Sequence, residues 1–97
     1  MDFNKLNSEL HQLSMPHRFP RKATELDRGY LKISDWLNDL CYYYEKKRKE
    51  QETYDEDEFK ALLDEYRAKI NELEASPYKD GLLKAINEVY KAIKIYK

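Results

Sequence analysis

Residues 24–51, TELDRGYLKISDWLNDLCYYYEKKRKEQ, decide the fold of this chain. Apolar residues recur here at every third or fourth position, which is the period of one buried helix face. The residues that share this face are Leu26, Tyr30, Ile33, Leu37, Leu40, Cys41 and Tyr44. Two flanks of the same helix are also apolar, with Trp36 and Tyr43 on one and Leu31 and Tyr42 on the other. Such a helix either lies at the centre of the fold or presents aromatic side chains to a partner.

The N-terminal segment predicts a short helix over residues 2–14, capped by Asp2. One face of this helix carries Phe3, Leu6, Leu10 and Leu13. Pro16 and Pro20 deny helical conformation to themselves and to the residues before them. We therefore expect a loop over residues 15–23.

Capping signals divide the rest of the chain into three helices. Thr24 opens the helix over residues 24–51, and Thr53 begins a stronger capping box for a helix over residues 54–75. The face of that third helix carries Phe59, Leu62, Leu63, Tyr66, Ile70 and Leu73. A rival interpretation joins these two helices into one long helix of a coiled-coil dimer, although the caps near Thr53 weigh against it.

The last helix is expected over residues 77–96, with Ser76 as its cap and Pro77 at its first position. Its apolar side carries Tyr78, Leu82, Leu83, Ile86, Val89, Tyr90, Ile93 and Tyr96. Asp80 and Gly81 could instead form a turn, in which case this helix would begin at Asp80.

These segments predict a single all-α domain over residues 1–97. Charged residues make up 38% of the chain, and it has only two glycines and three prolines, which favours helices over strands and loops. Short connections make successive helices antiparallel. We expect an antiparallel up-down bundle of three long helices, with the short N-terminal helix packed across it.

Composition limits the compartment and the partners. The 18 Lys and Arg residues nearly balance the 19 Asp and Glu residues, so the net charge of −1 gives no overall attraction to nucleic acid or anionic membrane. The single cysteine forms no internal disulfide, and neither a membrane-spanning stretch nor a signal-peptide hydrophobic region is present. We therefore predict a soluble cytoplasmic protein.

Richness in Lys, Glu, Tyr, Ile and Asn is typical of an AT-rich genome, such as that of a low-GC bacterium or its phages.

Catalytic and metal-binding patterns are absent from the sequence. Cys41 lies within the apolar face of its helix, whereas a reactive thiol needs a positive and partly exposed setting. His11 and His17 are not at a metal-ligand spacing, and no glycine-rich phosphate loop occurs. We predict a non-enzymatic protein with no catalytic residues, metal, cofactor or small-molecule substrate.

Two basic runs, residues 17–22 and 46–49, hold seven of the 18 Lys and Arg residues. They could bind phosphates while nearby aromatic rings stack on bases. Against this, acidic residues bracket the second run, and four consecutive helical residues point in four directions.

The run 17–22 also resembles a protein-binding loop in its chemistry. Prolines stiffen it, and it presents two arginines around Phe19, which are residue types enriched in binding hot spots. In the structural alternative, Phe19 plugs the end of the bundle and the arginines pair with carboxylates. Trp36, Tyr42 and Tyr43 likewise either belong to the core or form an exposed interface.

The leading hypothesis is an interaction protein that binds another macromolecule, most simply a protein, in the manner of an adaptor, inhibitor, chaperone or bacteriocin-immunity protein. Its expected partner-binding residues are His17, Arg18, Phe19, Arg21, Lys22, Trp36, Tyr43 and Lys47. The alternative is a small nucleic-acid-binding regulatory protein that uses both basic runs. A third interpretation is a homodimer in which the aromatic flank forms the seam.

Overall fold

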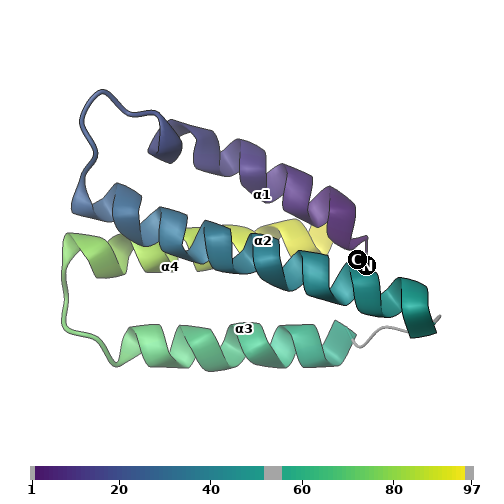
Figure 1. Cartoon of the computed structure of the whole chain (residues 1–97). Coiled ribbons are helices and arrows are strands. Elements are labelled where there is room, and N and C mark those ends of the chain that lie inside the picture. The colour runs from purple at the N-terminus through teal and green to yellow at the C-terminus, as the bar shows by residue number, and fades with distance from the viewer. Residues whose placement is uncertain (1, 52–55, 96–97) are drawn as a thin grey trace.

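The chain folds into four α-helices within the residues that the computed structural model describes, namely 2–51 and 56–95, with side chains described except at 48–51, 56 and 95. The helices are α1 (Phe3–Arg18), α2 (Glu25–Gln51), α3 (Glu56–Asn71) and α4 (Pro77–Ile95). α1 and α3 run in one direction, and α2 and α4 in the other (Figure 1). No strand occurs in the described ranges, and the predicted all-α up-down bundle is confirmed.

The centre of the bundle is the pair α2 and α4, with α1 on one side and α3 on the other (Figure 1). Gly29 of α2 and Gly81 of α4 allow the two backbones to touch. A Cβ atom on Gly29 would lie 2.2 Å from the carbonyl oxygen of Tyr78. One on Gly81 would lie 2.0 Å from the carbonyl oxygen of Leu26. Close contact therefore depends on both glycines having no side chain.

The start of α4 follows the capping prediction. The hydroxyl of Ser76 accepts a hydrogen bond of 3.1 Å from the backbone amide of Lys79, and Pro77 occupies the first helical position. The alternative start at Asp80 is wrong, because Gly81 lies inside the helix and not in a turn.

Five residues of the predicted α2 face are buried, namely Tyr30, Ile33, Leu37, Cys41 and Tyr44, whereas Leu26 and Leu40 of that face are half-buried. Four residues of α2 outside the predicted face are also buried, namely Asp27, Gly29, Ser34 and Glu45. Near the end of α2, the Tyr44 ring meets Phe3 of α1 and Phe59 of α3, with centroid distances of 5.7 Å to each. Phe3 and Phe59 also meet edge to face at 5.1 Å. This aromatic cluster ties three helices together at one end of the bundle.

The first helix is longer than expected, with 16 residues, as many as α3. It continues through Pro16 to Arg18, which leaves a shorter connection than the predicted loop over residues 15–23. Proline removes one backbone hydrogen bond near the helix end. The side chains of His17 and Arg18 offset that loss, because both form contacts with α2 that need helical geometry.

The buried face of α1 consists of Phe3, Leu6, Leu10, Ser14 and His17. Leu13 was expected on this face but is 36% exposed. The face continues from Leu10 by steps of four and three residues through Ser14 to His17. Burial therefore follows helical geometry, and a serine and a histidine take positions that hydropathy would not assign to a core.

The third helix ends at Asn71, four residues before the expected end. The amides of Glu72 and Leu73 bond to carbonyls three residues back, at 3.2 and 3.0 Å, which tightens the chain into a turn. Leu73, predicted to be in the core, is consequently 46% exposed. The predicted capping box at Thr53 lies outside the described residues.

The rival interpretation of one continuous helix is wrong, because α3 folds back along α2. Lys47 on α2 lies 3.6 Å from Glu58 on α3, measured between Nζ and Oε2. Farther along, the rings of Trp36 and Tyr66 are in contact, with centroids 4.5 Å apart. Antiparallel packing of the two helices explains both contacts.

Candidate functional site

A buried pair, His17 and Asp27, joins the end of α1 to the start of α2. His17 Nδ1 lies 2.6 Å from Asp27 Oδ1, and each residue is only 9% exposed. The other carboxylate oxygen of Asp27 accepts hydrogen bonds from the amide and the hydroxyl of Thr24, at 2.9 and 3.0 Å. The hydrogen bond from His17, followed by that from the Thr24 amide, lowers the pKa of Asp27 below its ordinary value. The ionised carboxylate thus completes the capping box with Thr24 and also holds α2 to His17 of α1.

The His17 ring extends this connection to α4. It stacks on the ring of Tyr30, with centroids 4.0 Å apart, and its Nε2 lies 3.4 Å from the amine of Lys84. The Tyr30 hydroxyl donates a hydrogen bond to Glu88 of α4. Burial, together with this bond, raises the pKa of Tyr30. An Asp-His pair can orient a general base, but the second ring nitrogen of this histidine is already in contact with the Nζ atom of Lys84.

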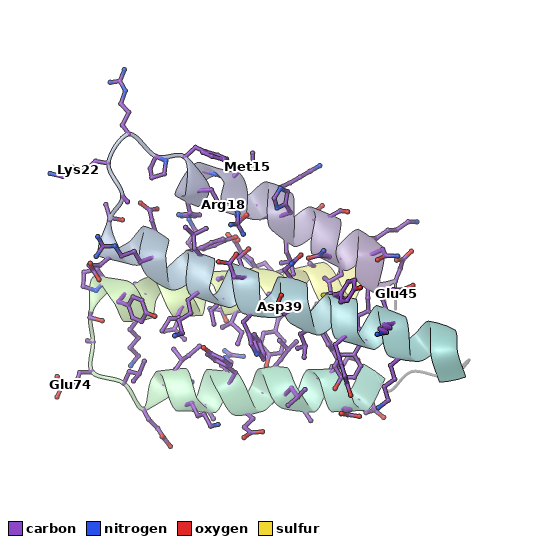
Figure 2. The ribbon with its side chains drawn as sticks, in the orientation of Figure 1. Met15, Arg18, Lys22, Asp39, Glu45 and Glu74 are labelled. Carbon is purple, nitrogen blue, oxygen red and sulfur yellow. The ribbon has the colours of Figure 1, made fainter. Side chains whose placement is uncertain are left out.

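Arg18 connects the same two helices on a more exposed side. Its Nε donates to the hydroxyl of Ser14 at 2.9 Å, and its Nη2 donates to Ser34 at 3.2 Å and to Asp35 at 2.8 Å. Figure 2 shows Arg18 directed into the space between α1 and α2. The guanidinium of Arg18 is therefore hydrogen-bonded within the chain. This agrees with the alternative in which the arginines of residues 17–22 pair with carboxylates.

The connection from α1 to α2 presents a different set of side chains to solvent. We define the α1–α2 tip as Met15, Phe19, Arg21 and Lys22. Phe19 is 76% exposed and Met15 is 41% exposed, so Phe19 does not plug the end of the bundle. The side chains of Arg21 and Lys22 are exposed and form no ion pair with any described residue. Lys22 projects away from the helices (Figure 2).

The remaining predicted site residues lie elsewhere. Trp36 is half-buried against Tyr66 of α3, and Lys47 is paired with Glu58. Tyr43 is 55% exposed and packs edge to face on Tyr44 of its own helix, at 5.2 Å.

Trp36, Tyr43 and Lys47 do not form one surface with the α1–α2 tip. Tyr43 lies ~27 Å along α2 from the first residue of that helix, at 1.5 Å per residue. Trp36 faces α3, on the side of α2 away from α1. Of the eight predicted binding residues, only Phe19, Arg21 and Lys22 are exposed residues of the connection between α1 and α2; Met15, one helical turn before Phe19, is exposed as well.

Comparisons of the chain with family models, curated proteins and solved structures found no match. Within the described residues, no group of three or more His, Cys, Asp or Glu side chains is arranged to hold a metal ion. No described helix is long and apolar enough to cross a membrane.

Sequence reasoning missed an apolar hollow between α2, α3 and α4. Its volume is about 410 Å³. Its lining residues are Lys32, Tyr66, Lys69, Ile70, Leu73, Tyr78 and Leu82. The sequence did not reveal this hollow, because a helix continuing to residue 75 would place Leu73 in the core. An early end to α3 leaves that side chain at the rim.

Proposed function

We propose that this chain is a non-enzymatic interaction protein that binds a protein partner through the α1–α2 tip. The supporting observation is Phe19, a large aromatic side chain that is 76% exposed between two helices. An exposed aromatic costs solvation free energy unless something covers it, and aromatic and arginine side chains dominate binding hot spots. Arg21 and Lys22, which form no ion pair with a described residue, favour a partner with an apolar pocket edged by carboxylates.

Rigid support for the tip strengthens this proposal. The His17–Asp27 pair and the bonds of Arg18 join the end of α1 to α2, so that the backbone next to Phe19 should lose little conformational freedom when a partner binds. Preorganisation of this kind improves affinity because less entropy is lost on association. An adaptor, inhibitor, chaperone or immunity protein acting in the cytoplasm would fit this surface.

The experiment replaces Phe19 with the photoreactive residue benzoylphenylalanine and cross-links the partner in nuclease-treated cell extract. A protein so identified is then purified and its affinity measured. Phe19→Ala should weaken binding by about tenfold or more. Tyr42→Ala is the matched control, because Tyr42 is 72% exposed at the far end of α2 and should leave affinity unchanged. Equal loss in both variants would contradict a specific role for the tip.

Nucleic-acid binding is the competing hypothesis, and a separate titration of the purified protein tests it. A phosphate-binding surface would show affinity for mixed-sequence DNA or RNA that falls steeply with salt. Arg21→Glu with Lys22→Glu would then abolish binding, whereas Phe19→Ala would have a smaller effect. That pattern would replace the protein-binding proposal.

A further inference from the structure

The hollow between α2, α3 and α4 has an apolar floor and a cationic rim. Ile70 and Leu82 form the floor and are only 2% and 3% exposed. Tyr66 and Tyr78 are half-buried beside them, and Leu73 stands at the rim, 46% exposed. An uncovered apolar surface of this kind can pack against an aliphatic chain of a ligand.

Two lysines belong to the lining, and no Asp or Glu does. Lys32 comes from α2 and Lys69 from α3, and both residues are exposed. Lys69 contacts Glu65 one turn away at 3.3 Å, but an exposed pair of this kind contributes little and exchanges readily. Lys32 forms no ion pair within the described part of the chain. The hollow is therefore complementary to an apolar group that ends in a negative charge.

The size of the hollow favours a narrow occupant. A single turn of α-helix, about 11 Å across and 5.4 Å in pitch, occupies roughly 500 Å³. The available volume is about 410 Å³, which suits an extended hydrocarbon chain better than an embedded helix of a partner. The geometry points to a binding site for a single-chain anionic amphiphile, a fatty acid, with its chain over Ile70 and Leu82 and its carboxylate between Lys32 and Lys69.

The single tryptophan offers a direct readout of this site. The Trp36 ring packs at a tilt of 44° against the ring of Tyr66, which lines the hollow, so an occupant should change the fluorescence of Trp36. We would titrate the intact protein with laurate, dodecanol and dodecyltrimethylammonium, each below its micelle concentration. Laurate should bind with saturation, and about tenfold more tightly than the cationic amphiphile. A brominated fatty acid should quench Trp36 when it occupies the same site.

Charge reversal tests the rim. Lys32→Glu with Lys69→Glu should weaken laurate binding about tenfold while leaving dodecanol binding unchanged. Both side chains are exposed, and circular dichroism should confirm that the variant keeps its fold. Arg21→Glu with Lys22→Glu at the α1–α2 tip is the matched control and should leave laurate affinity unchanged. This control also separates the proposal from the proposed protein-binding function.

Two results would overturn the inference. The first is equal affinity for the three amphiphiles with no effect of charge reversal, because it would indicate nonspecific hydrophobic binding. The second is absence of saturable laurate binding, and saturable binding of an acidic amphipathic peptide in its place would assign the hollow to a protein partner.

Discussion

Gly29 and Gly81, the two glycines of the chain, oppose each other where α2 and α4 cross. The position of a Cβ on Gly81 lies 2.0 Å from the Leu26 carbonyl oxygen and 2.8 Å from the Tyr30 amide nitrogen. These neighbours are backbone atoms and cannot turn aside as a side chain would. The contact between the two central helices is therefore set by the absence of side chains at both positions.

Gly81→Ala should destabilise the protein although it raises helix propensity. Alanine gains about 1 kcal/mol over glycine in a free helix. Separating the two backbones should cost more than this, for a net loss of about 2 kcal/mol. Urea denaturation would measure the change. Asn87→Ala, at an exposed position of the same helix, should be neutral or stabilising, and a similar gain in Gly81→Ala would contradict the packing interpretation.

The case of Gly81 illustrates the limit of local sequence patterns. The dipeptide of Asp80 and Gly81 is typical of turns, and the sequence offers no direct sign that the glycine serves close helix packing instead. The apolar face of α2 was predictable because a regular period repeats over many residues. A single glycine gives no repeating pattern, so its role in helix packing can be recognised only from the position of the partner helix.

Asp27 should contribute stability above its ordinary pKa of 3.8 and lose that contribution in acid. Its pKa is lowered in the folded state, mainly by the hydrogen bond from His17, so folding favours the ionised form. Asp27→Asn should therefore be less stable than the wild type at pH 6. That difference should shrink as pH falls below 3.8 and through the lowered pKa of the folded state.

Urea denaturation at pH 6 and at successively lower pH values would test the role of Asp27. Asp39→Asn is the matched control, since Asp39 is exposed and forms no ion pair in the described residues. The difference in stability between Asp39→Asn and the wild type should not change with pH in the way expected for Asp27→Asn. An Asp27→Asn difference that stayed constant with pH would argue against the His17 contact.

The candidate site was predictable only in part, because the run 17–22 divides between two environments. Helical geometry carries His17 and Arg18 inward to carboxylates on α2, whereas the helix ends before Phe19, and the Phe19, Arg21 and Lys22 side chains are exposed. Sequence composition identified the basic and aromatic side chains. It could not locate the helix end, since the contacts that outweigh Pro16 are with residues ten and seventeen positions away.

Replacement by alanine should therefore lower the stability much more at Arg18 than at Phe19. Arg18→Ala removes hydrogen bonds to Ser34 and Asp35 and should cost about 1–2 kcal/mol of unfolding free energy. Phe19→Ala alters an exposed side chain and should stay within about 0.5 kcal/mol of the wild type. Thermal and urea denaturation of the two variants would measure both effects. A large loss of stability in Phe19→Ala would show that the ring packs within the fold.

Cys41 should be unreactive as long as the protein is folded. The residue is 2% exposed, and burial raises the pKa of its thiol from 9.0 to about 12. At pH 8 the thiolate fraction should be lower than that of a free cysteine by about three orders of magnitude, and reagent access is blocked as well.

Ser8→Cys places a second thiol on the exposed surface of α1 and provides an internal standard for Cys41. With a chromogenic disulfide reagent at pH 8, this variant should show one fast and one slow phase of equal amplitude. Urea should merge the two phases, because unfolding exposes Cys41. If both thiols reacted at the fast rate in the folded protein, Cys41 would not be buried between α2 and the neighbouring helices.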